Sequence, residues 1–464
     1  MHKVKERSSE SFDAIRRAFS EFLLLPAIII FCFFLLAAGT YLLDTSEDGW
    51  LIPGREFLQA HIFASAKATS DLLGAIAAGI ISVTSLTITL LLIVVQQSAA
   101  SMTAQVFDQF LRRKTNQIYF GFFVGLALYS LITLATVNDP FNPVWGGTVA
   151  LLLTIIALFL LVLLMYTTIN QMRPVEIIEA IHQHILTSRN KQLQLINKTR
   201  RASSVQSTVF KEVSCTKHGY IARINLEVFE QVQNEIKEEW EVVFYVSIGT
   251  FVSYDDTFAM VKASNPEHLN RISKAVLKAV HIDRQRDIDL DPAYGIEQLG
   301  TIAWTSISTS KSNPTPGLLT IRSLRNILAR WSEEPPETDV KTLPVVYTDN
   351  TFAALMDTFE TLGVVSSESM QHQNFIEVIR SLGLLMHRLP APIRLRAEDT
   401  ILRLLSVLGD HVLTNEMETA LITLSAKLRS LDMNITAAAV DEARATLAQS
   451  VGKLNSRATR VPLK

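Results

Sequence analysis

The stretch DLLGAIAAGIISVTSLTITLLLIVVQQ, residues Asp71 to Gln97, decides the architecture of this chain. It carries no charged residue after Asp71, and it exceeds the roughly 20 mostly apolar residues that a helix needs to cross a bilayer. Three further apolar segments of similar length accompany it. The four expected spans are about 22–43, 72–95, 118–137 and 144–168. The sequence therefore predicts an α-helical polytopic membrane domain with four transmembrane helices in residues 22–170.

Composition separates this membrane domain from the rest of the chain. The protein has 464 residues, a net charge of -2 and 48% hydrophobic residues, but the long apolar runs all lie before residue 170. A near-neutral charge gives no reason to expect nucleic acid as a partner. The two cysteines, Cys32 and Cys215, lie inside and beyond the apolar segments, so we expect no disulfide.

Basic residues predict the orientation of the spans. Lysine and arginine are frequent in the tail of residues 1–21, in the loop containing Arg112, Arg113 and Lys114, and after the fourth span. The first loop has only Arg55 and Lys67, and the third loop has no basic residue. Because positive residues stay on the cytoplasmic side, we expect both termini in the cytoplasm. The expected location is a bacterial inner membrane, with its lipids as one partner.

The remainder of the chain reads as a cytoplasmic α+β region, a small mixed β domain followed by mostly helical sequence. Strand patterns occur at Gly219–Ile224 and Glu241–Val246, and helical periodicity punctuated by prolines dominates later. No internal repeat at a fixed period is evident. The expected domains are a cytoplasmic N-terminal tail at 1–21, the membrane domain at 22–170, a juxtamembrane helix and linker at 171–204, a β-rich domain at 205–265 and a helical domain at 266–464.

Several stretches together resemble a widespread family of predicted bacterial integral membrane proteins known only as a domain of unknown function. They are Ser70–Ser101, Phe110–Leu134, His218–Asn225, Ile248–Val252 and Asp289–Ala303. The resemblance implies the same architecture, a membrane domain followed by a soluble region. It implies no activity, so function has to be argued from the residues.

A polar face runs along the second span. Ser82, Ser85, Thr89 and Gln96 are spaced by 3, 4 and 7 residues, so they lie on one side of a helix. Such a face is a candidate pore lining, where hydroxyls replace part of the hydration of a solute. It is also a candidate packing face, with hydroxyls bonded across helices or back to their own helix. Both interpretations stay open at this point.

Small residues predict close helix packing. Gly74 and Ala78 continue the row of Ser82 in the second span, and Gly121 and Gly125 form a GxxxG motif in the third. Small residues at this spacing let two helix backbones approach closely, within one chain or between copies. We therefore expect a homo-oligomer.

The spans and loops lack the usual marks of catalysis. No Asp, Glu, Lys, Arg or His lies within residues 22–43, 72–95, 118–137 or 144–168, which disfavours proton-coupled pumps and voltage sensors. The acidic run Asp283, Asp287, Asp289 and Asp291 departs from the calcium-loop pattern, because arginines interrupt it and the required glycine is missing. We expect no enzyme, no cofactor and no metal site.

Two hypotheses follow. The first is an oligomeric, channel-like membrane protein with a cytoplasmic gating or sensing domain. The second is a non-conducting membrane sensor or scaffold, whose cytoplasmic helical domain recruits a protein partner.

Overall fold

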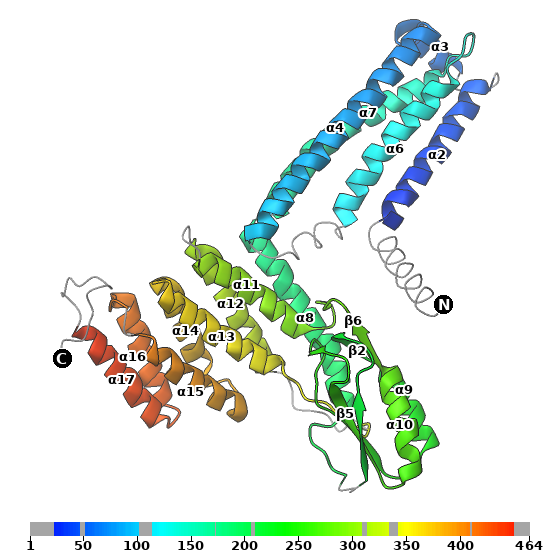
Figure 1. Ribbon diagram of the computed structural model, residues 1–464. Helices are drawn as coiled ribbons and strands as arrows, with labels where there is room; N and C mark the ends of the chain where they lie inside the picture. Colours follow the sequence, from blue (N-terminus) through cyan, green and yellow to red (C-terminus); the bar gives the residue numbers. More distant parts are fainter. Residues whose placement is uncertain are drawn as a thin grey trace. The chain divides into compact units, whose positions relative to one another are not determined.

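The computed structural model describes residues 23–46, 52–101, 114–171, 173–205, 209–308, 313–333, 342–408 and 411–449. It divides the chain into two compact units, residues 1–173 and residues 174–464. The first is built of long apolar helices, and the second combines two small sheets with an array of helices (Figure 1). The predicted fold class, a four-helix membrane domain followed by an α+β region, is confirmed.

The membrane unit consists of four long helices and one short one. They are α2 (Leu24–Thr45), α3 (Ile52–His61), α4 (Ala66–Ser101), α6 (Lys114–Thr136) and α7 (Val144–Gln171). By length and composition, segments Leu24–Thr45, Ala66–Thr89, Lys114–Thr136 and Val144–Asn170 are able to cross a membrane. The four predicted spans therefore correspond to four helices.

Helix α6 is the centre of this unit. It packs against α2, α4 and α7, and half of its most apolar window is buried, a larger share than in the other three spans. Phe123, Leu126 and Tyr129 of α6 meet Phe33 of α2 and Leu73 of α4 in one apolar core. The outer faces of α2, α4 and α7 are left for contacts outside this core.

The connection between the first two spans differs from the predicted loop of residues 44–70. Helix α2 continues through Asp44 to Thr45, α3 follows, and α4 begins at Ala66. The first helix therefore includes an ionisable residue that the predicted span, 22–43, left out. The predicted tail, residues 1–21, lies outside the described residues.

The second unit begins with α8 (Pro174–Lys198). Its apolar face, including Ile178, Ile181 and Ile185, is buried, and α8 packs against α11 (Pro292–Ser308) and α12 (Pro314–Trp331). Ile196, near its end, joins the core of the sheets. The predicted juxtamembrane helix and linker at 171–204 is thus mostly one helix of the folded unit, because its apolar stripe has partners far along the chain.

Two sheets and two helices form the α/β part of this unit. Its elements are β1 (Phe210–Ser214), β2 (Gly219–Ile224), α9 (Glu227–Glu235), β3 (Trp240–Phe244), β4 (Phe251–Val252), β5 (Thr257–Ala263), α10 (Pro266–Ala279), β6 (Val280–Asp283) and β7 (Val345–Val346). One sheet has the order β1-β5-β3-β7 and the other β4-β2-β6. All neighbours are antiparallel except β3 and β7, which are parallel.

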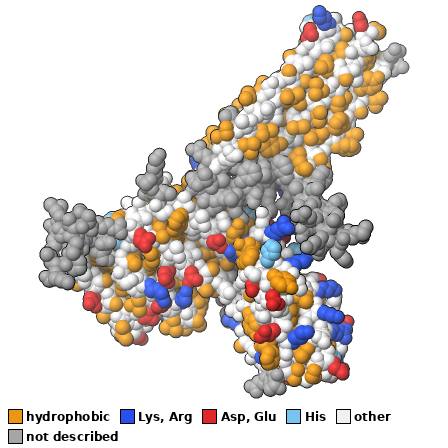
Figure 2. All heavy atoms as spheres, in the orientation of Figure 1, with side chains coloured by type: hydrophobic (Ala, Val, Ile, Leu, Met, Phe, Trp, Pro, Cys, Tyr) orange, Lys and Arg blue, Asp and Glu red, His pale blue; other side chains and the backbone are white. Residues whose placement is uncertain are grey.

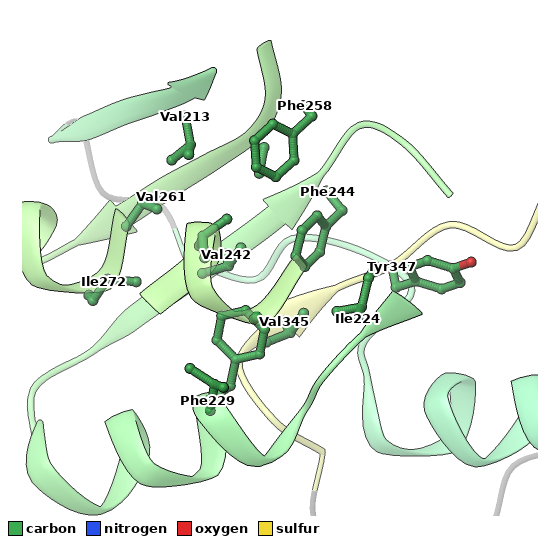
Figure 3. Close-up of a cluster of buried hydrophobic side chains, with 14 of the residues drawn as sticks. Val213, Ile224, Phe229, Val242, Phe244, Phe258, Val261, Ile272, Val345 and Tyr347 are labelled. Carbon is green, nitrogen blue, oxygen red and sulfur yellow. The ribbon is translucent and has the colours of Figure 1, made fainter. Parts of the chain in front are cut away.

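Both sheets share one apolar core with α9 and α10. Figure 3 shows side chains from β3, β5 and β7 turned toward those of α9 and α10, with Phe229, Phe244 and Ile272 among them. Strands β6 and β7 lie after residue 265, so the β-rich domain extends past its predicted end. Both are short and too weakly patterned for the sequence to reveal, and they form because β2 and β3 offer edges.

The rest of the second unit is a two-layer array of helices, seen as a row in Figure 1. One layer contains α11, α13 (Thr351–Glu368), α15 (Ala391–Ser406) and α17 (Asn434–Ala448), each packed on the next. The other contains α12, α14 (His372–Leu385) and α16 (Asn415–Arg429). The starts of α13, α15 and α17 are roughly 40 residues apart, which is typical of stacked helical hairpins. Structural repetition is therefore present where the sequence shows no fixed period.

Candidate functional site

The outward face of α4 holds the residues that the sequence marked as a pore or packing face. Its inner face, with Leu73, Ile76 and Ile80, is buried against the other helices. The opposite side carries Gly74, Ala78, Ser82, Ser85, Thr89 and Gln96, which span about 80° of the helix circumference at 3.6 residues per turn. All are exposed except Gly74, which is partly exposed. We call this set the α4 polar face.

Among the described residues, none packs against this face at Gly74. A Cβ atom added at Gly74 would meet nothing within 4 Å. The Thr89 hydroxyl donates to the Ser85 carbonyl at 2.9 Å, within the helix itself. Bonding back to the helix satisfies that hydroxyl hydrogen and leaves oxygen lone pairs free to accept further bonds.

The other outward surfaces of the membrane unit have a different chemistry. On α7 the exposed side chains are large and apolar, among them Ile155, Phe159 and Val162. Helix α2 also exposes large apolar side chains, such as Phe31 and Leu35. Figure 2 shows hydrophobic side chains gathered over the membrane unit. Bulky apolar side chains suit contact with lipid. The α4 polar face, on which the exposed Leu92 also lies, therefore differs from the α7 surface in its row of hydroxyl side chains.

Gly121 and Gly125 lie in a contact within the chain. A Cβ at Gly125 would come within 2.3 Å of the Phe33 ring of α2, and one at Gly121 within 3.0 Å of the Pro26 backbone. The GxxxG motif of α6 therefore receives α2 of the same chain. Gly74 and Ala78 have no such role in the described residues, so the predicted small-residue sets occupy two different environments.

A second cluster, which sequence reasoning missed, lies where α2, α6 and α7 end or begin. Asp44 is 2% exposed, and its carboxylate accepts the backbone N–H groups of Trp145 at 2.8 Å and Gly146 at 2.9 Å. These are among the first residues of α7, whose amide groups lack partners within the helix. Tyr129 donates to the Gly146 carbonyl oxygen at 3.1 Å. An aspartate directly after an apolar run was the available signal.

Asn142 links the same end of the unit to α4. Its Oδ1 accepts the Thr69 hydroxyl at 2.6 Å, and its Nδ2 donates to the Phe63 carbonyl at 2.9 Å. All of these groups are buried. These two hydrogen bonds hold the turn before α7 against the start of α4.

In the second unit, polar side chains join α8 to the sheets and the helical array. Arg189 of α8 donates to Asp349 at 2.8 Å and to Gln192 at 2.7 Å. Nearby, the hydroxyl of Tyr347 accepts the Ile248 N–H at 3.1 Å, and burial raises the pKa of Tyr347 to about 12. The arrangement is a buried junction rather than an open site.

Aspartates of the acidic run that follows β6 form hydrogen bonds and ion pairs with other side chains of the protein. Asp291 accepts from Arg286 at 2.8 Å, and burial raises the pKa of Asp291 against the lowering effect of that arginine. Asp289 lies 3.1 Å from His184, whereas His182 bonds Ser323 at 2.8 Å. Among the residues the structure describes, no group of three or more His, Cys, Asp or Glu side chains is placed to hold a metal ion.

Four apolar spans and a large second unit define a polytopic membrane protein. Residues 20–365 match the model of a family described as "Predicted membrane protein (DUF2254)", and the chain belongs to this family. The resemblance inferred from the sequence is thereby confirmed. No curated protein and no solved structure matches the chain. The family match ends within α13, so α14 to α17 lie beyond it.

Proposed function

We propose that the protein is an oligomeric, channel-like membrane protein in which the α4 polar faces of several copies line a path across the membrane. The observation that carries this proposal is the contrast between the hydroxyl side chains of that face and the bulky apolar face of α7. A lipid-facing helix gains nothing from a row of small and hydroxyl side chains, whereas helices that approach each other closely do. Hydroxyl oxygens facing a gap between copies also provide acceptors for a hydrated solute.

The α4 polar face supplies no charged side chain after Asp71 in its described part. A path lined by Ser82, Ser85 and Thr89 therefore selects by size and by hydrogen bonding rather than by strong charge. The second unit is the gating or sensing element in this proposal. Both termini are cytoplasmic and the membrane is a bacterial inner membrane, as the distribution of basic residues favours.

The reactivity of introduced cysteines tests whether water reaches the α4 polar face. Single cysteines at Ser82, Ser85 and Thr89, in a Cys32→Ala background, are expected to react with small water-soluble thiol reagents in the membrane. Phe159→Cys, halfway along α7 on its apolar face, is the matched control and should stay unreactive. If all four cysteines are inert, or if the purified protein is a monomer in mild detergent, the pore is excluded.

A second candidate function is a non-conducting scaffold, favoured by the helical array. Stacked hairpins present extended surfaces that suit protein partners. Ser85→Leu separates the two candidates. In a pore it blocks passage and leaves stability nearly unchanged, whereas in a packed interface it overfills the contact and destabilises the assembly by about 1–3 kcal/mol.

Reporter fusions test the orientation. Fusions after Asp48 and Asn142 are expected to report the periplasm, and fusions after Lys114 and Arg201 the cytoplasm. A periplasmic signal from the second unit would overturn the proposed orientation.

A further inference from the structure

A cavity of about 600 Å³ lies between α2, α6 and the turn that precedes α7. Its volume is within the usual range for small-molecule sites, roughly 300–1,000 Å³. Two of its lining side chains, Phe34 and Tyr41, are 45% and 44% exposed, so the cavity is reachable from outside the helix pair. It is separate from the α4 polar face, and none of its lining residues comes from α4.

The packing of α2 on α6 explains why space is left here. At Gly121 and Gly125 the two helices touch so closely that an added Cβ would clash. Further along the same pair, α2 contributes the small residues Ala37 and Ala38 to the cavity lining. These small side chains leave space beside the helix contact, which continues here through the hydrogen bond that Tyr129 of α6 donates to Thr40 of α2 at 3.2 Å.

The lining has a polar end and an apolar end. The polar end holds Asp44, at the end of α2, and Asn138 and Asp139, in the turn after α6. The apolar end holds Phe34, nearer the middle of the α2 span, and Ile132. In this proposal α2 crosses the apolar part of the bilayer, and Asp44 lies at the end of that helix. The change from apolar to polar lining therefore matches an amphiphile whose head lies at the membrane interface.

The charged residues of the lining indicate which head group of an amphiphile the cavity would bind. Asp44 and Asp139 are its carboxylates, and none of the described residues that line it is Lys, Arg or His. Arg55 of α3 attracts Asp44 electrostatically but is not in the lining. The rings of Tyr41 and Phe141 lie 5.5 Å apart at the same end. Carboxylates beside aromatic rings favour an ammonium group, through charge attraction and cation–π contact.

We propose that this cavity binds an amphiphile with an ammonium head and a hydrocarbon tail. The head lies between the two carboxylates and the Tyr41–Phe141 pair, and the tail follows Ala37, Ala38 and Phe34. Asp44 keeps its bonds to the start of α7, since each carboxylate oxygen accepts more than one hydrogen bond. A bilayer lipid with an ammonium head and a free cationic amphiphile share this chemistry.

Protection of a cysteine in the cavity tests the proposal on the full chain. Ala38→Cys in a Cys32→Ala background is alkylated in neutral detergent with and without dodecyltrimethylammonium or dodecyl phosphate. We expect the cation to slow alkylation at least tenfold and the anion to leave it unchanged. Leu42→Cys, on an exposed part of α2 outside the cavity, should react equally in all three conditions. Equal protection by both amphiphiles, or by neither, would overturn the proposal.

Charge variants and a bilayer sharpen the test. Asp139→Asn should weaken protection by the cation about tenfold, whereas Asp71→Asn, a carboxylate of α4 outside the lining, should not change it. In nanodiscs, protection by phosphatidylethanolamine but not by phosphatidylglycerol identifies a lipid as the ligand. Protection only by the added cation identifies a free amphiphile. The unmodified protein offers a second measurement, because its melting temperature should rise with the cation and not with the anion.

Discussion

Replacing Gly125 and Gly74 by alanine makes a paired test of where the membrane unit is closely packed. Both glycines lie inside long apolar helices, so both substitutions gain a similar amount of helix propensity, about 0.5–1 kcal/mol. They differ in surroundings. The new methyl at Gly125 would lie 2.3, 2.8 and 2.9 Å from three atoms of the Phe33 ring, whereas the one at Gly74 meets nothing within 4 Å among the described residues.

The steric cost at Gly125 follows from what holds Phe33. Carbon atoms prefer about 3.5–4.0 Å, so the ring has to move by about 1 Å or more. Phe33 is 7% exposed and lies edge-on to Phe122 and Tyr129, so a shift disturbs neighbours. Overpacking of this kind costs about 1–3 kcal/mol. Since the propensity gain is common to both variants, this term is the expected difference in unfolding free energy between them.

Unfolding of the purified variants in mild detergent, followed by circular dichroism at matched oligomeric state, measures the difference. Gly125→Ala should be less stable than the parent or equal to it, and Gly74→Ala equal or more stable. A Gly125→Ala protein as stable as Gly74→Ala would refute the close α2–α6 contact. The Gly74 variant also reports on assembly, because weakened oligomers with an intact fold would locate the interface on the α4 polar face.

Three further predictions concern the described polar contacts and α8. Asp44→Ala removes the acceptor of one buried and one partly buried backbone N–H group and should destabilise the membrane unit by about 2–3 kcal/mol. Asp44→Asn should cost less, since one acceptor remains, and thermal unfolding in detergent measures both. Tyr347→Phe leaves the Ile248 N–H unpaired and should cost about 1–3 kcal/mol. Because the pKa of Tyr347 is raised to about 12 in the folded protein, its contribution to the free energy of unfolding is complete below pH 10 and is lost as the pH rises toward 12. Unfolding measured over a pH series should show this dependence in the parent and not in Tyr347→Phe. Residues 174–464 should express as a cooperatively melting fragment and residues 205–464 should not, because removing α8 leaves the partners of Ile181 and Ile185 uncovered; a stable shorter fragment would contradict the role of α8.

The sequence predicts the membrane unit well because each span is a local feature. An uninterrupted apolar run of sufficient length requires a helix wherever it lies, and all four runs form one. The outward position of Ser82, Ser85 and Thr89 was also consistent with their spacing, but periodicity does not tell which side of a helix faces the core. That depends on Leu73 and Ile80 meeting α6, a relation between distant residues.

What the sequence could not predict depends on contacts between distant residues. Asp44 looks like the first residue of a loop, and only its bonds to Trp145 and Gly146 make it part of a buried joint. Strand β7 has two residues and exists because β3 lies beside it. The cavity is lined by Ala37 and Ala38 of α2 together with residues of the distant turn before α7, and small residues alone do not reveal such a site.

The partners of α8 have a consequence for the order in which the chain folds. Roughly 100 residues separate α8 from α11 and α12, on which its apolar face packs. At about 5–20 residues per second of synthesis, that face waits roughly 5–20 s for its partners while strands β1 to β6 are made. During translation α8 emerges directly after the last span, with Ile178, Ile181 and Ile185 uncovered. The apolar face of α8 therefore stays without its folded-state partners until α12 has left the ribosome.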